Sequence, residues 1–160
     1  MTIDRKDLQV KPSTITGAGK GLFTRVFIPK DTLIIEYEGD ILTWNEIKAE
    51  FDNDYIYYVN ARHVINARHR KDAIARYIND AEGIKKTKGL SNNCIYKTIG
   101  DKVYVQATRD IQPRSELFVS YGRGYWETGR LNAEIAAAEQ SKGQPGKKKP
   151  ARDSNRKKTA

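Results

Sequence analysis

The stretches that decide the fold are, in chain order, GAGKGLF at residues 17–23, EYEGDIL at 36–42, ARYIND at 75–80, NNC at 92–94 and ELFVSYG at 116–122. Glycine, asparagine and aspartate in them favour turns, whereas the β-branched and aromatic residues beside them favour strands. No single stretch identifies a fold. Their order along the chain is the informative feature.

Around these stretches the chain reads as short strands with little helix. Thr43 and Glu46 form a capping-box pattern that predicts one early helix, with Ile47, Phe51 and Trp44 on its buried face. Apolar runs predict strands at 32–37, 55–59, 63–66, 94–99, 102–108 and 116–121, and residues 72–79 predict a short helix or a buried turn. We therefore expect a mostly β protein.

The charge is distributed unevenly over the 160 residues, whose formal net charge is +9. Residues 142–160 hold eight Lys and Arg and one acidic residue, so the remainder of the chain is close to neutral. The length fits one domain with a tail. The predicted organisation is a flexible leader at 1–9, a domain at 10–126, a C-terminal helix at 127–140 and a basic disordered tail at 141–160.

Several functional classes are excluded by the sequence. A single cysteine, Cys94, cannot form an intrachain disulfide or a cluster of thiolate metal ligands, and we expect no metal site. No apolar run approaches the roughly 20 residues of a membrane helix. The glycines of Gly17–Gly21 precede a strand-like run, not the helix of a dinucleotide-binding loop.

The series of stretches resembles the SET domain of protein-lysine methyltransferases over residues 10–126. The glycines at 17–21 resemble its first motif. ARYIND followed by NNC resembles its third motif, and ELFVSYG resembles its fourth. The resemblance implies a fold of small β-sheets with a C-terminal pseudoknot, in which the Asn93–Cys94 segment passes next to the segment that ends at Tyr121.

The resemblance also implies a reaction, in which a methyl group moves from S-adenosyl-L-methionine to a lysine amine. Positioning dominates such a transfer, because no covalent step is required of the protein. Three tyrosines match channel positions of the family: Tyr121 as the catalytic tyrosine, and Tyr37 and Tyr96 as channel walls. Their rings suit the lysine stem and their hydroxyl groups suit the amine. Packing between strands is the competing interpretation for each.

The cofactor set follows from the same motifs. It comprises Lys20, Gly21, Leu22, Arg76, Tyr77, Asn79, Tyr121 and Trp126. Gly21 permits close approach of the backbone, and Asn79 is expected to bind the amino-acid part of the cofactor. Trp126 is expected to cover the adenine; Tyr125 competes for that role, and Trp126 could equally anchor the end of the domain.

The chain departs from the family pattern at two places. Asp80 stands where the family has a histidine, and the loop that follows it to Asn92 is long. No cysteine-rich segment follows the fourth motif, so no zinc-bound extension can close the lysine channel. The resemblance also implies that a small residue two positions before Tyr121, here Val119, together with Tyr96 gives a product that is chiefly monomethyl-lysine.

The predicted function is therefore methylation of a basic protein substrate, such as a histone or histone-like protein. The alternative is a non-catalytic SET-like module that binds a peptide or nucleic acid, with the basic tail as a DNA tether. Residues 142–160 suit nonspecific contact with nucleic acid. We expect an intracellular protein: nuclear if eukaryotic, cytoplasmic or a secreted effector if bacterial. The sequence predicts no membrane contact and leaves the oligomeric state open.

Overall fold

The fold is built from short strands and very little helix. The computed structural model describes residues 2–50, 53–83, 87–121 and 138. The elements are the 3-10 turns η1 (Arg5–Asp7) and η2 (Ile74–Tyr77), the helix α1 (Trp44–Ile47), and the strands β1 (Leu8–Pro12), β2 (Lys20–Thr24), β3 (Leu33–Glu36), β4 (Asp40–Leu42), β5 (Ile56–Asn60), β6 (His63–Asn66), β7 (Cys94–Ile99) and β8 (Lys102–Ala107). The mostly β class predicted from the sequence is confirmed.

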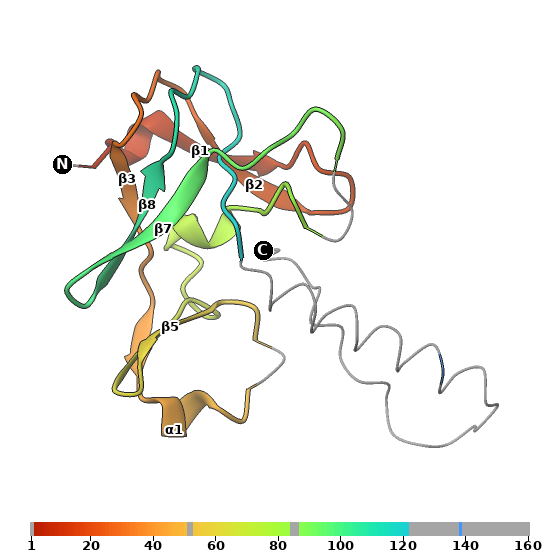
Figure 1. The fold of residues 1–160 in the computed structure, drawn as a ribbon. Helices are drawn as coiled ribbons and strands as arrows, with labels where there is room; N and C mark the ends of the chain where they lie inside the picture. Colours follow the sequence, from red (N-terminus) through yellow and green to blue (C-terminus); the bar gives the residue numbers. More distant parts are fainter. Residues whose placement is uncertain (1, 51–52, 84–86, 122–137, 139–160) are drawn as a thin grey trace.

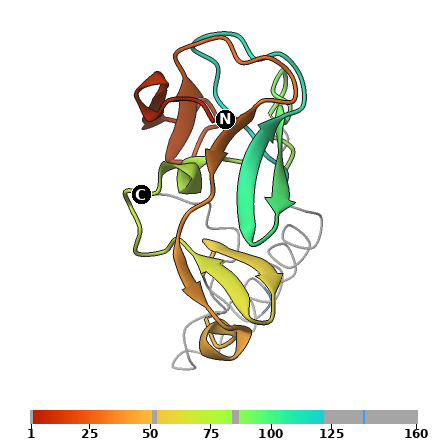
Figure 2. The same ribbon diagram turned by 90° about the vertical axis from the view of Figure 1, so that its left-hand side faces the viewer.

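The strands form three small antiparallel sheets, with orders β1-β2, β3-β8-β7 and β4-β6-β5. The sheet β4-β6-β5 lies with α1 at one end of the molecule, and the other two sheets lie at the opposite end (Figures 1 and 2). The backbone passes between the two ends directly from β3 into β4. The small sheets therefore meet in the middle of the molecule, where the segments between them converge.

The core fills this junction and draws on all three sheets. Its fully buried side chains include Leu22, Ile34, Ile78, Val105, Leu117 and Val119. Each buried aliphatic side chain of this size contributes about 1.5–3 kcal/mol relative to its exposed state. The residues that carry the family motifs are thus anchored by the main core.

A crossing of two chain segments completes the fold. Residues 116–119 lie between the stretch at Asn79 and the start of β7, with isolated parallel bridges Asn79↔Phe118 and Cys94↔Val119. The side-chain oxygen of Asn93 accepts a hydrogen bond of 2.8 Å from the Phe118 amide. The expected passage of the Asn93–Cys94 segment beside the segment that ends at Tyr121 is confirmed.

Some expected elements differ in the structure. The predicted strand at 116–121 is wrong: these residues make single bridges to three separate segments, not one continuous ladder. The Thr43–Glu46 capping box is confirmed, and Ile47 is buried, but Trp44 is 43% exposed. Phe51 lies outside the described residues. Leu8 and Gln9, expected in the leader, begin β1 and pair with β2.

The expected C-terminal helix and tail fall almost entirely outside the described residues. In the part of the chain that the structure describes, no helix is long and apolar enough to cross a membrane.

Candidate active site

Three tyrosine rings from different segments form a cluster, called the tyrosine cluster below: Tyr37 after β3, Tyr57 in β5 and Tyr96 in β7. The ring centroids of Tyr57 and Tyr96 are 5.1 Å apart. Tyr37 lies 5.8 Å from Tyr96 and 6.1 Å from Tyr57. Such tilted or edge-on pairs contribute about 0.5–1.5 kcal/mol beyond their buried area. The structure thus brings together two of the predicted channel residues, Tyr37 and Tyr96.

The third member, Tyr57, was missed by the sequence analysis. It stands opposite Ile65 in the β5–β6 ladder and so shares the face of the sheet that packs toward Tyr37 and Tyr96. The next residue, Tyr58, is 55% exposed and makes an edge-on contact with Trp44. Strand alternation was the signal that could have found Tyr57, but alternation alone does not say which face is buried.

The hydroxyl groups of Tyr37 and Tyr96 stay protonated at neutral pH. The Tyr37 hydroxyl is buried and donates a 3.1 Å hydrogen bond to the carbonyl of Tyr55. Burial raises the pKa of Tyr37 well above its ordinary value, and the nearby Arg76 guanidinium opposes that rise. Desolvation also raises the pKa of Tyr96, and the neighbouring Tyr37 and Tyr57 raise it further. The cluster therefore offers neutral hydrogen-bonding groups.

A buried cation lies beside two further tyrosine rings, those of Tyr55 and Tyr77. Arg76 in η2 is 3% exposed, and its guanidinium lies 4.1 Å from the Tyr55 ring centroid and 5.4 Å from that of Tyr77. Its Nη1 donates to the carbonyl of Arg68 at 3.1 Å. Its Nε is buried with no hydrogen-bond partner among the described residues. Two of the predicted cofactor residues, Arg76 and Tyr77, thus contact each other.

Asn79 joins the first and third motifs. Its Nδ2 donates to the Lys20 carbonyl at 2.8 Å and to Oε1 of Glu116 at 3.3 Å. Its Oδ1 is buried and, within the described ranges, accepts no hydrogen bond. An unsatisfied buried acceptor is costly unless a donor fills it. Asn79 therefore presents one amide oxygen suited to a ligand N–H group.

Gly21 is required for an internal reason. A Cβ atom at this position would overlap the Glu116 carboxylate and lie 3.4 Å from Nδ2 of Asn79. The missing side chain thus lets the Gly21 backbone lie close to Glu116 and Asn79. The approach of the cofactor to Gly21 stays a prediction, since the nearest atoms that need the room belong to the protein itself.

Asp80 holds Tyr121 in place. Its buried carboxylate accepts a 2.9 Å hydrogen bond from the Tyr121 amide through Oδ2. Its Oδ1 accepts from the Glu82 amide and from Nδ2 of Asn92, both at 2.9 Å. The hydroxyl of Tyr121 donates to the Ile78 carbonyl at 2.6 Å. The residue that replaces the family histidine therefore connects the long loop to the predicted catalytic tyrosine.

The remaining predicted site residues contribute mainly through backbone or packing. Leu22 is fully buried and its carbonyl accepts from the Leu117 amide at 2.8 Å. Val119 is also fully buried, with its amide donating to the Asn79 carbonyl at 2.9 Å. The Lys20 ammonium lies 6.0 Å from the Tyr77 ring. Trp126 lies outside the described residues.

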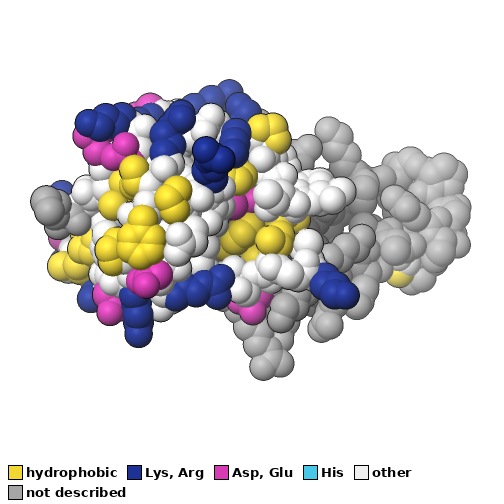
Figure 3. Space-filling view, turned by 90° about the horizontal axis from the view of Figure 1, so that it is seen from above, with side chains coloured by type: hydrophobic (Ala, Val, Ile, Leu, Met, Phe, Trp, Pro, Cys, Tyr) yellow, Lys and Arg dark blue, Asp and Glu magenta, His cyan; other side chains and the backbone are white. Residues whose placement is uncertain are grey.

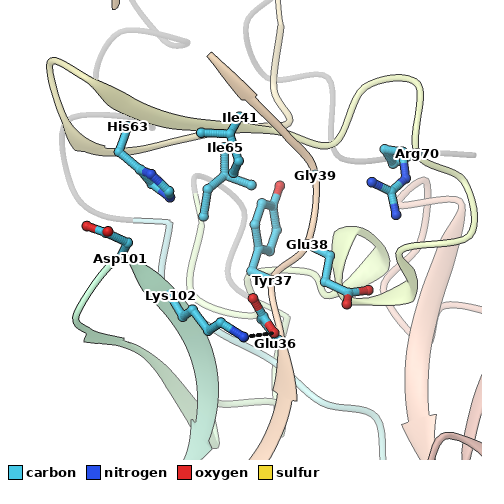
Figure 4. Close-up of a pocket in the computed structure, with 10 residues that line it drawn as sticks. All are labelled: Glu36, Tyr37, Glu38, Gly39, Ile41, His63, Ile65, Arg70, Asp101 and Lys102. Atoms are coloured by element: carbon cyan, nitrogen blue, oxygen red, sulfur yellow. Dashed lines mark ion pairs between the residues drawn. The ribbon is translucent and has the colours of Figure 1, made fainter. Parts of the chain in front are cut away.

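Tyr37 of the tyrosine cluster lines a surface hollow of about 340 Å³ (Figure 4). The hollow lies at the junction of β3 and β4 and faces β6 and the β7–β8 turn. Lys102 and Glu36 form an ion pair at its edge, with 3.6 Å between Nζ and Oε2. Its lining residues are Glu36, Tyr37, Glu38, Gly39, Ile41, His63, Ile65, Arg70, Asp101 and Lys102. Tyr37 thus belongs to both features.

Metal and thiol chemistry find no support in this region. Over the described ranges, no three His, Cys, Asp or Glu side chains are grouped so that they could hold a metal ion. Burial raises the pKa of the Cys94 thiol to about 12. Its Sγ donates to the Asn93 side-chain oxygen at 3.3 Å, which is a structural role.

Comparisons with known proteins agree with this architecture. The sequence model of a family described as "SET domain" matches residues 19–122. Among solved structures, a humanized mutant of the Chaetomium thermophilum Polycomb Repressive Complex 2, bound to the inhibitor GSK126, is similar with a TM-score of 0.58 and 21% identity. The match covers 76% of this chain and 15% of that chain. A comparison with curated proteins finds no match.

Proposed function

Because the chain belongs to the SET-domain family, we propose that it is a protein-lysine N-methyltransferase that uses S-adenosyl-L-methionine and acts on a basic protein such as a histone or histone-like protein. The observation that carries the proposal is the tyrosine cluster. Three tyrosine rings packed against one another form an aromatic lining that suits the aliphatic stem of a lysine.

The lysine side of the reaction is supported by the charges around the cluster. The amine must lose its proton before it can attack a methyl group. Arg76 is a buried cation whose field already reaches Tyr37. A cation at this position disfavours a second positive charge nearby, as does burial itself. Both effects favour the neutral, nucleophilic amine in the channel.

The cofactor side is supported by the unfilled acceptor of Asn79. S-adenosyl-L-methionine supplies a methyl group on a positively charged sulfur, which makes the carbon electrophilic. The residues that would hold it are Lys20, Gly21 and Leu22 through their backbone and Asn79 through Oδ1, the buried oxygen with no partner in the described structure. The ammonium group of an amino-acid moiety is a fitting donor for that oxygen.

Tyr121 is proposed as the catalytic tyrosine. Two hydrogen bonds fix it, one through its hydroxyl to the Ile78 carbonyl and one through its amide to Asp80. Residues 78–80 also include Asn79, so the same short segment positions Tyr121 and the proposed cofactor acceptor. A rigid arrangement of this kind contributes to the rate by fixing the approach of the two reactants.

A basic substrate suits the hollow beside Tyr37. Its walls carry three carboxylates, from Glu36, Glu38 and Asp101, and two cations, from Arg70 and Lys102. We propose that the product is chiefly monomethyl-lysine. Val119 is fully buried and Tyr96 keeps its hydroxyl protonated, so a water held by that hydroxyl can occupy the space of a second methyl group.

The test is incubation with labelled S-adenosyl-L-methionine and a panel of histones and bacterial basic proteins. Tyr121→Phe should lower methyl transfer by about 100-fold, because the hydroxyl that fixes the ring is lost. Tyr58→Phe removes a hydroxyl from an exposed tyrosine outside the cluster and should leave the rate unchanged. Equal rates for the two variants would contradict the proposal.

The alternative, a binding module without turnover, makes a different prediction. It predicts that calorimetric titration with S-adenosyl-L-methionine detects no binding. The methyltransferase predicts binding that weakens in Asn79→Ala, since the buried acceptor is removed.

A further inference from the structure

One turn of the fold places an arginine at positive φ, and there the Arg114 amide donates to the Thr24 carbonyl at 2.7 Å. In the turn Gln112–Ser115, the Ser115 amide donates to the Gln112 carbonyl at 3.3 Å, and Arg114 has a φ of +70°. The third position of such a turn favours glycine, because a side chain at positive φ costs roughly 1–2 kcal/mol. The Arg114 guanidinium makes no hydrogen bond or ion pair to any residue that the structure describes.

The strained arginine lines a surface hollow of about 260 Å³, separate from the site described above. Arg109, Ser91 and Ser115 line it as well. Nη2 of Arg109 donates to Oγ of Ser91 at 2.9 Å, which holds the Arg109 guanidinium at the wall of the hollow. Two arginines and two serines therefore line one hollow, and the side chains of all four can donate hydrogen bonds.

The acidic residue in the lining does not offset these donors. Glu116 is 5% exposed, and both its carboxylate oxygens already accept hydrogen bonds. Oε1 accepts from Ser13 and Asn79, and Oε2 accepts twice from Thr14. Its hydrogen-bond acceptors are thus already occupied by protein donors, so the carboxylate is not left to pair with Arg109 or Arg114.

Further basic side chains stand near the hollow. Phe23 lines the hollow, and the Lys11 ammonium lies 4.3 Å from the centroid of the Phe23 ring. Lys88 is exposed and precedes Gly89, another lining residue. The segment that follows β8 passes over the top of the molecule in Figure 1, and Figure 3, which views this end, shows Lys and Arg side chains gathered there.

We propose that this hollow binds a backbone phosphate of a nucleic acid. Planar guanidinium groups recognise phosphate oxygens with paired hydrogen bonds, and the serine hydroxyls add donors without selecting a base. A nucleic acid is favoured over a single phosphorylated side chain because residues 142–160 carry eight Lys and Arg, which suit an extended polyanion. This activity is separate from the proposed methyl transfer and does not depend on it.

The key variant is Arg114→Gly in the full chain. It removes the guanidinium and relieves the strained φ together, so it should raise the melting temperature while weakening DNA binding. We expect affinity for a short labelled duplex to fall about tenfold, the scale of one charge-assisted hydrogen bond. The slope of log K against log salt should decrease by about 0.9, the value of one phosphate contact.

Two variants are matched controls. Asp31 has a φ of +69° in an equivalent turn, where the Thr32 amide donates to the Pro29 carbonyl at 3.3 Å. Asp31→Gly relieves the same kind of strain and should raise the melting temperature without weakening DNA binding. Arg62→Gln removes an exposed positive charge from the β5–β6 turn and should change the affinity less than twofold.

The proposal is overturned if Arg114→Gly binds the duplex as tightly as Arg62→Gln does, with an unchanged salt slope. It is also overturned if Arg114→Gly weakens binding of a phosphoserine peptide but not of the duplex, since the site would then serve a protein ligand. Arg109→Gln provides a second variant at the same hollow, and a loss of affinity and salt slope comparable to that of Arg114→Gly is expected.

Discussion

Glu116→Gln is the sharpest test of how the predicted cofactor motifs are held together. The carboxylate of Glu116 is 5% exposed and accepts four hydrogen bonds: from Oγ of Ser13 at 2.7 Å, from the amide and Oγ1 of Thr14 at 2.8 and 2.6 Å, and from Nδ2 of Asn79 at 3.3 Å. All four partners are donors. A glutamine has one acceptor oxygen, so its amide group must face two of them.

The magnitude follows from these contacts. Two hydrogen bonds to a charged group are lost, each worth about 1.5–3 kcal/mol, and the remaining two are no longer strengthened by the carboxylate charge. Part of this loss is recovered when Ser13 and Thr14 turn toward water, because both lie near the surface. We therefore expect the free energy of unfolding to fall by about 3 kcal/mol, or about 10 °C in melting temperature for a domain of this size.

The assay is urea unfolding followed by circular dichroism, with Glu36→Gln as the matched control. Glu36→Gln is the same chemical change in a partly exposed ion pair with Lys102. It should lower the free energy of unfolding by less than about 1 kcal/mol. If both variants unfold at the same urea concentration, the Glu116 network does not stabilise the fold and the reasoning is refuted.

Three further predictions concern the candidate site. Tyr96→Phe should raise the number of methyl groups per lysine, as read by mass spectrometry; an unchanged monomethyl product would argue against the water-holding role of the hydroxyl. Asp80→Asn keeps the size but has one acceptor oxygen in place of two, so kcat should fall about tenfold as Tyr121 loosens; an unchanged kcat would argue against a positioning role for Asp80. Because burial raises the pKa of Cys94 to about 12, the thiol stays protonated at pH 8, and iodoacetamide should label the native protein on the order of a thousandfold more slowly than the protein unfolded in urea; rapid labelling of the native protein would be the opposite result.

The strands that could be predicted are those whose hydrogen bonds are local. The runs that form β7 and β8 are joined by the turn at Gly100, which makes them partners in a hairpin. Their β-branched residues favour strands on both sides of that turn. The capping box at Thr43 is equally local, since both partners lie within one helical turn. In each case the residues that decide the element are neighbours in sequence.

The features that escaped prediction depend on distant segments. Residues 116–121 look like a strand, yet their partners are Phe23, Asn79 and Cys94, which no local pattern reveals. Tyr57 joins the tyrosine cluster only because the sheet β4-β6-β5 packs toward Tyr37. The family motifs indicated Tyr37, Tyr96 and Asn79 as site residues. The contacts of these residues with Tyr57, Lys20 and Glu116 come from the structure.

The crossing of residues 116–119 has a consequence for how the protein reaches its native state. These residues bridge to segments 93, 39 and 25 positions earlier in the chain. Pairing over such separations is slow, because the chain must lose the entropy of loop closure before any contact is gained. On a ribosome, the sheets built from earlier residues can form first, whereas the surroundings of Asn79 and Tyr121 assemble only once the final motif has emerged. A nascent chain that stalls before residue 116 would thus carry most of its strands and still lack the site.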